Sequence, residues 1–220
     1  MRSKLFIILG GLLAVFSLYY FGRTTEKKSL SPQQETPSVS TFNFSSFLGA
    51  EKQKLPLTIR QLTESLELQA QNASDTEKIN YFTNLAGIWR DSAGQPELYG
   101  YYTGEAAKLA NSEKKLTFAA QLTVDILRRQ KDESRVDWLS SRSIDLFERA
   151  IRLNPDNDDL KVGLGSAYIF GRGRTGHPEE TMKGVQQLLA VARKDSNNMK
   201  AQLMLGIDRK STRLNSSHRT

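Results

Sequence analysis

The chain has 220 residues, with 31 lysines and arginines against 24 aspartates and glutamates, two histidines and no cysteine. A sequence without cysteine excludes disulfide frameworks, zinc sites with thiolate ligands and thiol nucleophiles, and two histidines are too few for chemistry that needs several imidazoles. A hydrophobic share of 38% is enough to bury a core in a domain of this length.

The net charge of +7 is confined to the two ends of the chain. Residues 1–28 hold five basic side chains against one acidic, and residues 208–220 hold four against one. The residues between them hold 22 of each sign and are neutral. A basic protein suggests nucleic acid as a partner, but a neutral central region lacks the basic surface that such binding needs. We therefore expect no nucleic-acid partner.

An uncharged apolar run extends over residues 5–22 (LFIILGGLLAVFSLYYFG). As a helix it would span roughly 27 Å at about 1.5 Å per residue, just enough to cross a bilayer. We expect residues 1–23 to be an uncleaved single-pass anchor in the inner (cytoplasmic) membrane, with the body of the protein in the periplasm. A cleaved signal peptide and a buried core helix are the alternatives, and the nearly balanced basic flanks leave the orientation open.

The next two segments differ in composition. Residues 24–46 are rich in Ser, Thr, Pro and Gln and offer little to bury, which predicts a flexible tether. Residues 47–74 are expected to form a leading helical segment, with Ile59, Leu62 and Leu66 facing inward.

The main body of the chain has a helical pattern. Between residues 50 and 207 apolar residues recur at intervals of three and four, and glycine and proline fall between the segments, which predicts an all-α fold. The expected helices cover residues 57–71, 75–92, 97–110, 113–130, 137–153, 158–170, 179–194 and 199–207.

Large and small residues recur in these helices at a spacing of 34 positions, with insertions of eleven and seven residues before the later sets. The matched sets are Phe82, Leu85, Ala86 and Trp89; Leu116, Ala119, Ala120 and Thr123; Leu164, Gly165 and Tyr168; and Leu205 and Gly206. This spacing is typical of a repeat built from two antiparallel helices, which approach closely where the small residue lies.

The pattern resembles that of tetratricopeptide repeats. Phe147, Ala150 and Pro155 match the large residue, the small residue and the closing proline of the second helix of that repeat. The resemblance implies a solenoid of helix pairs over residues 75–207, with three repeats and the start of a fourth.

The chain is also similar to a group of bacterial membrane-anchored tetratricopeptide proteins. The similarity lies in the short anchor, the Ser/Pro tether and the segments 88–92 (IWRDS), 101–109 (YYTGEAAKL) and 161–171 (KVGLGSAYIFG). This group implies no particular reaction.

In tetratricopeptide proteins the first helices of the pairs line a groove that binds an extended peptide or a partner helix. The resemblance places the groove residues at Asn80, Thr83, Gly87, Lys114, Thr117, Gln121, Asp159, Val162 and Ser166. These side chains are polar and mixed, and a groove without a strong field suits a partner recognised by hydrogen bonds and shape, not an acidic polymer. We therefore expect a membrane-tethered protein-protein interaction scaffold or assembly factor, with a protein or peptide partner and without catalysis, cofactor or metal.

A glycine-rich loop offers an alternative. Residues 171–176 (GRGRTG) match G-x-G-x-x-G and carry two arginines. A dinucleotide-binding loop must follow a strand, whereas this one follows an amphipathic helix, so the pattern favours an elongated turn between helices. The alternative function is an accessory domain of an envelope enzyme or assembly system, with ligand or phosphate contact at the loop from Gly171 to His177.

The last residues differ from the rest. Residues 208–218 (DRKSTRLNSSH) resemble the conceptual translation of a common sequencing-adapter oligonucleotide. We therefore expect residues 208–220 to be a non-native tail, and the visible chain to be a fragment of a longer protein.

Overall fold

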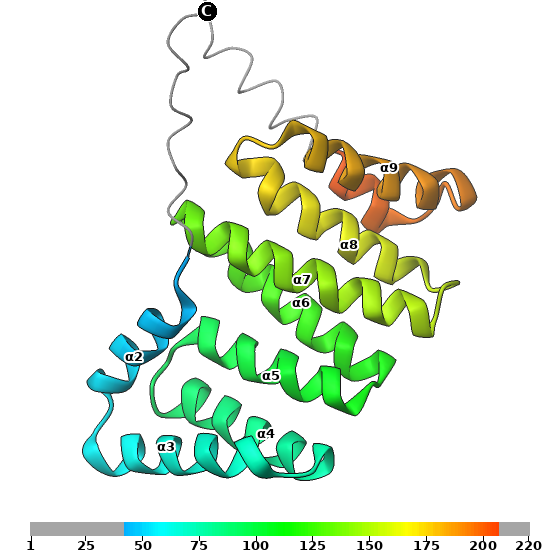
Figure 1. Cartoon of the computed structure of the whole chain (residues 1–220). Coiled ribbons are helices and arrows are strands. Elements are labelled where there is room, and N and C mark those ends of the chain that lie inside the picture. The colour runs from blue at the N-terminus through cyan, green and yellow to red at the C-terminus, as the bar shows by residue number, and fades with distance from the viewer. Residues whose placement is uncertain (1–41, 207–220) are drawn as a thin grey trace, which may run out of the picture. The chain divides into compact units, whose positions relative to one another are not determined.

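The structure is a computed structural model that describes residues 42–206 (Figure 1). The regular elements of this part are helices, and consecutive helices pack in neighbouring pairs, α4 with α5, α6 with α7 and α8 with α9 (Figure 1). The prediction of an all-α fold is confirmed for these residues, and the succession of pairs is consistent with a helical repeat. The helices are α2 (Phe44–Lys54), α3 (Leu57–Asn72), α4 (Asp75–Asp91), α5 (Pro96–Ala110), α6 (Glu113–Arg129), α7 (Glu133–Leu153), α8 (Asp158–Phe170), the short 3-10 helix η1 (Arg172–Thr175), α9 (Pro178–Lys194) and a last helix over residues 199–206.

The helix starts are set by local residues. Ser74, Asp132 and Asn157 precede α4, α7 and α8, and their side chains accept hydrogen bonds from free backbone N–H groups of the first turn. Pro96 and Pro178 occupy the first turns of α5 and α9, where a missing N–H costs nothing. Six of the expected helices therefore agree with the structure within one residue at each end.

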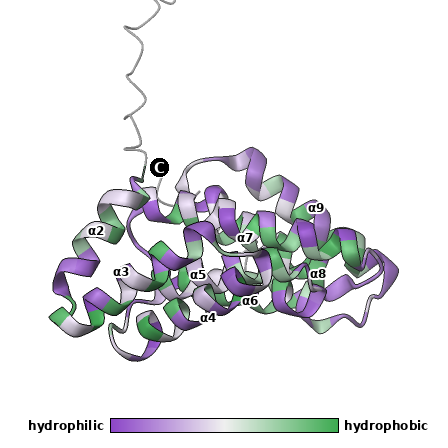
Figure 2. Ribbon diagram, turned by 60° about the horizontal axis from the view of Figure 1, so that its bottom comes forward, coloured by the Kyte–Doolittle hydropathy of each residue, from purple (hydrophilic) through white to green (hydrophobic). Residues whose placement is uncertain are grey.

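The core includes most of the residues that recur at the 34-residue spacing, whereas Gly206 is exposed. Leu85 and Trp89 of α4 and Leu116 and Ala120 of α6 are completely buried. Hydrophobic and hydrophilic residues alternate along each helix, so that each helix has a side to bury (Figure 2). The largest core cluster joins α5, α6, α7 and α8 through Ala107, Leu116, Ala119, Ala120, Val124, Leu146, Phe147, Ala150, Leu160, Leu164 and Ala167.

Glycine allows the closest helix contacts. A Cβ atom added at Gly163 would lie 2.3 Å from the Phe147 ring, so α7 and α8 can approach as they do only with a hydrogen at this position. A Cβ atom at Gly184 would lie 2.7 Å from the carbonyl oxygen of Gly165, where α8 crosses α9. The small residue predicted at Gly165 thus lies at a helix crossing.

The N-terminal boundary of the helical region corrects the sequence interpretation. The expected tether, residues 24–46, ends too late, because α2 begins at Phe44; the expected leading helical segment, residues 47–74, includes most of α2 but was given no separate helix there. The ring of Phe44 lies 4.1 Å, centroid to centroid, from Tyr101 of α5, and Phe42 lies 4.9 Å from Trp138 of α7. Aromatic contacts made far along the chain therefore fix a segment whose Ser-rich composition indicated a tether.

Two further differences are local. The helix expected to begin at residue 137 begins at Glu133, since Asp132 caps it there. Leu62, which was expected to face inward, is 48% exposed, whereas Ile59 and Leu66 pack against the core as expected.

Within residues 42–206, no helix has both the length and the apolar character needed to cross a membrane. The predicted membrane anchor, residues 1–23, and the predicted non-native tail, residues 208–220, lie outside the described residues.

Candidate functional site

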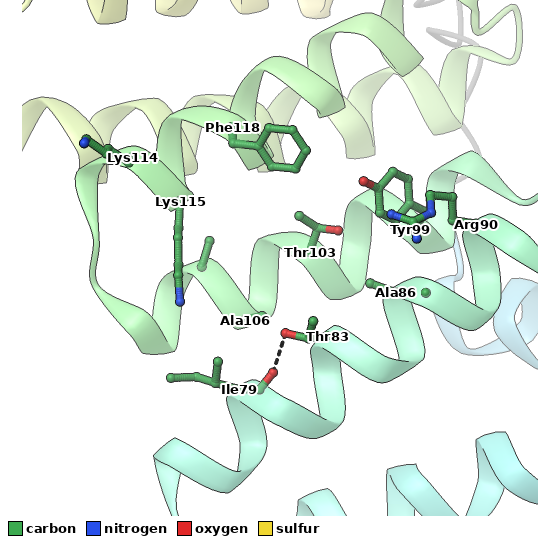
Figure 3. Close-up of a pocket in the computed structure, with 12 residues that line it drawn as sticks. Ile79, Thr83, Ala86, Arg90, Tyr99, Thr103, Ala106, Lys114, Lys115 and Phe118 are labelled. Carbon is green, nitrogen blue, oxygen red and sulfur yellow. Dashed lines mark hydrogen bonds between the residues drawn. The ribbon is translucent and has the colours of Figure 1, made fainter.

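Two hollows lie beside the predicted groove positions, one on each side of α6. The α4–α6 hollow has a volume of about 470 Å³, and the α6–α8 hollow has a volume of about 190 Å³. The α4–α6 hollow is lined by Ile79, Thr83, Ala86, Gly87 and Arg90 of α4, Tyr99, Thr103, Ala106 and Ala107 of α5, and Lys114, Lys115 and Phe118 of α6 (Figure 3). The α6–α8 hollow is lined by Gln121, Val124, Asp125, Arg128, Phe147, Val162, Gly163, Ser166, Lys200, Leu203 and Met204.

The structure brings six of the nine predicted groove residues into these hollows. The α4–α6 hollow contains Thr83, Gly87 and Lys114, and the α6–α8 hollow contains Gln121, Val162 and Ser166. The predicted positions therefore do not form one continuous lining, because α6 separates them into two sets.

The other three predicted residues line neither hollow. Asn80 is exposed on α4. The Thr117 hydroxyl donates to the backbone carbonyl of Glu113 at 2.8 Å, within its own helix. The carboxylate of Asp159 accepts a hydrogen bond from the ammonium of Lys200 at 2.9 Å, so it ties α8 to the last helix.

The sequence interpretation missed the aromatic side chains of the α4–α6 hollow. Phe118 is 55% exposed although it is a large hydrophobic residue, and it projects from α6 toward the space above α5 (Figure 3). Tyr99 lies at the other end of the same hollow. A signal for Phe118 was present, since it falls outside the stripe of α6 formed by Leu116, Ala119 and Ala120.

The charges of the α4–α6 hollow are all positive. Its lining contains Arg90, Lys114 and Lys115 and no carboxylate. Arg90 is bound at 2.7 Å and 2.9 Å to both carboxylate oxygens of Asp91, and its guanidinium lies 5.5 Å from the ring centroid of Tyr99. Lys114 and Lys115 make no ion pair with any residue of the described part of the chain. The hollow thus presents two lysines without an ion-pair partner among residues 42–206.

The α6–α8 hollow has charges of both signs. Asp125 and Arg128 both line it from α6. The guanidinium of Arg128 lies 4.3 Å from the ring centroid of Phe170 and 3.8 Å from the sulfur of Met204. Its cations therefore already have partners within the protein.

A third region, which we call the α5–α7 seam, combines rings and ions where α2 meets α5 and α7. The guanidinium of Arg142 lies 4.4 Å from the ring centroid of Tyr101 and donates to Glu105 at 2.6 Å. Burial raises the pKa of Glu105, but hydrogen bonds and positive charges from Arg142 and Lys108 outweigh burial and hold this pKa below its ordinary value. The seam is a closed structural joint, because each of these charges has a partner.

The glycine-rich loop is bound to the rest of the protein. The Arg172 guanidinium donates to the Ser141 hydroxyl at 2.9 Å, and the Arg174 guanidinium donates to the backbone carbonyl of Gln130 at 2.6 Å. His177 ends the loop beside the start of α9. Both arginines therefore serve as ties between helices, as an elongated turn requires.

Comparison with protein families, curated proteins and solved structures gives no match to this chain. The tetratricopeptide resemblance stays a prediction, and the functional proposal rests on the geometry described above.

Proposed function

We propose that this protein is a scaffold of tetratricopeptide type that binds a protein or peptide partner along α4, α6 and α8. The observation that supports this function is the pair of hollows on the two sides of α6, which contain six of the nine predicted groove residues. These residues are the positions that the tetratricopeptide resemblance assigns to the groove. Their coincidence with the hollows favours a binding surface.

The lining of the hollows suits the burial of partner side chains. Ala86, Gly87, Ala106 and Ala107 give the α4–α6 hollow a floor of small residues, and Phe118 gives it an exposed aromatic edge. Apolar floors with a polar rim are the usual anatomy of sites that accept a peptide side chain.

The proposal includes the predicted anchor. Residues 1–23 would hold the scaffold at the inner membrane of a bacterium, with the helical unit on the periplasmic side, where it would assemble other envelope proteins. The loop from Gly171 to His177 does not support a second function, since Arg172 and Arg174 already donate to protein acceptors.

Site-specific photocrosslinking tests the proposal. The full chain would carry p-benzoylphenylalanine at Asn80 or Gln121, which are exposed on α4 and α6, and at Arg152, which is exposed on α7, as the control. In membranes of the source organism, we expect a protein adduct of the same mass at both groove positions and none at Arg152. Adducts of equal yield at all three positions, or none at the groove positions, would contradict the function.

A further inference from the structure

We propose that the α4–α6 hollow selects an acidic peptide segment that carries one large apolar side chain. The apolar side chain would occupy the floor between Tyr99 and Phe118, and flanking carboxylates would pair with Lys114 and Lys115. This inference rests on the proposed function and names the kind of partner that the same surface binds.

The shape and chemistry of the α4–α6 hollow suit a large apolar side chain. A volume of about 470 Å³ lies within the range of ligand sites, roughly 300–1,000 Å³. Two rings, Tyr99 and Phe118, stand over a floor that includes Ala86 and Ala106 (Figure 3). Exposure of Phe118 to water is unfavourable, and a partner side chain that covers it would gain the apolar area that the protein leaves open.

The lining of the α4–α6 hollow has positive charges without a carboxylate among its residues. Some lysines on neighbouring helices are paired, as Lys108 is with Asp145 at 2.9 Å and Lys161 with Asp158 at 3.3 Å, although Lys78 of α4 is not. Lys114 and Lys115 make no such pair within residues 42–206. A carboxylate brought by a partner would supply what the protein does not.

Lys114 and Lys115 lie at the start of a helix. α6 begins at Glu113, so Lys114 and Lys115 lie in its first turn, where the helix dipole disfavours cations. The carboxylate of Glu113 accepts a hydrogen bond from the side-chain amide of Asn157 at 3.2 Å and forms no ion pair with either lysine. Lys115 points toward the hollow and Lys114 lies at its edge (Figure 3). The two lysines and the free N–H groups of the first turn of α6 thus place positive charge at this end of the hollow, next to the carboxylate of Glu113.

The same surface favours a peptide over a nucleic acid. The positive end of the α4–α6 hollow adjoins an apolar floor, and Asp125 lines the next hollow along α6. A polyanion that followed α6 would meet this carboxylate, whereas a peptide can carry its negative charge at one place only.

Fluorescence anisotropy with the full chain in detergent tests this inference. The probes are three labelled peptides of equal length: one with a central phenylalanine between glutamates, one with alanine in place of the phenylalanine, and one with lysines in place of the glutamates. We expect the first to bind, the other two to bind at least about tenfold more weakly, and the affinity to fall as salt is added.

Matched variants locate the binding. Lys114→Glu combined with Lys115→Glu should weaken binding of the acidic phenylalanine peptide by about tenfold or more. Lys131→Glu combined with Arg152→Glu makes the same change of charge at two exposed positions away from the hollow and should leave it unchanged. Phe118→Ala should weaken binding, and Met182→Ala, a residue of the same 55% exposure on α9, should not. Circular dichroism establishes that each variant is folded. Lys115→Ala removes the charge of this lysine without reversing it and is therefore a milder change than Lys115→Glu.

The outcomes separate this inference from the proposed function. Any of three results would overturn the acidic-peptide assignment. The acidic and basic peptides could bind equally, or the Lys114→Glu and Lys115→Glu double variant could bind the acidic peptide as the wild type does. The third such result is displacement of the peptide by an oligonucleotide of equal charge. If the Gln121 adduct persists under any of these outcomes, the scaffold function stands with another class of partner. If that adduct is absent as well, both proposals fail.

Discussion

The α5–α7 seam and the α4–α6 hollow contain the same kinds of side chain, aromatic rings beside cations, but the structure uses them differently. In the seam, Arg142 lies over Tyr101 and is bound to Glu105, so both ring and charge are covered. In the hollow, Phe118 is exposed and Lys115 has no ion-pair partner among residues 42–206. The difference is a carboxylate: the seam contains Glu105, which pairs with its cation, whereas the lining of the hollow contains none and leaves room for a partner.

Among changes to the seam and the hollow, the largest effect is expected from removing the Trp138 ring. Trp138 contacts Phe42 at 4.9 Å and Phe44 at 5.4 Å between ring centroids, so Trp138→Ala should lower the free energy of unfolding by about 2–3 kcal/mol. Because Phe44 of α2 and the preceding Phe42 both contact this ring, the amide hydrogens of α2 should exchange faster, while those of α9 change little. Unchanged exchange in α2 would contradict the structural role of the seam.

A smaller loss is expected when the ion pair of the seam is broken. Arg142→Met keeps much of the apolar stem but leaves Glu105 without its shortest hydrogen bond, at 2.6 Å, which should cost about 1–2 kcal/mol of unfolding free energy. Arg149→Met is the control, since Arg149 pairs with Asp145 in a more exposed position and should contribute about 0.5 kcal/mol or less. Equal losses in the two variants, measured by urea denaturation, would show that the seam is no more than a surface ion pair.

The same pair predicts a pH dependence. The pKa of Glu105 in the folded protein lies below its ordinary value of 4.5, so its contribution is present above pH 4.5 and is lost as the pH falls through the folded-state pKa. The difference in unfolding free energy between wild type and Arg142→Met should therefore shrink below about pH 4.5. Glu105→Gln, which removes the titrating group, should flatten the acid limb of the stability curve. Parallel curves for wild type and Glu105→Gln would contradict this assignment.

The contrast between seam and hollow also explains what the sequence could predict. Helix boundaries at Ser74 and Asn157 depend on capping groups within a few residues, and buried positions such as Leu116 follow the helical period, so both were accessible from local patterns. The start of α2 was not accessible from local patterns, because Phe42 and Phe44 contact Trp138, which lies far along the chain. The tetratricopeptide resemblance likewise implied groove residues on α4, α6 and α8 but not that α6 would divide them into two hollows. That division depends on how the helix pairs are offset, which no local pattern records.

The smallest effect on stability is expected in the hollow, where Phe118→Ala should change the free energy of unfolding by no more than about 0.5 kcal/mol. Its ring is 55% exposed, so little packing is lost; Leu116→Ala, two residues earlier and completely buried, should cost about 2–4 kcal/mol. If binding of the acidic phenylalanine peptide is weakened by Phe118→Ala while stability is kept, the ring contributes to recognition and not to folding. A loss of stability approaching that of Leu116→Ala would show that Phe118 is a core residue after all, and the α4–α6 hollow would then be a structural joint like the seam.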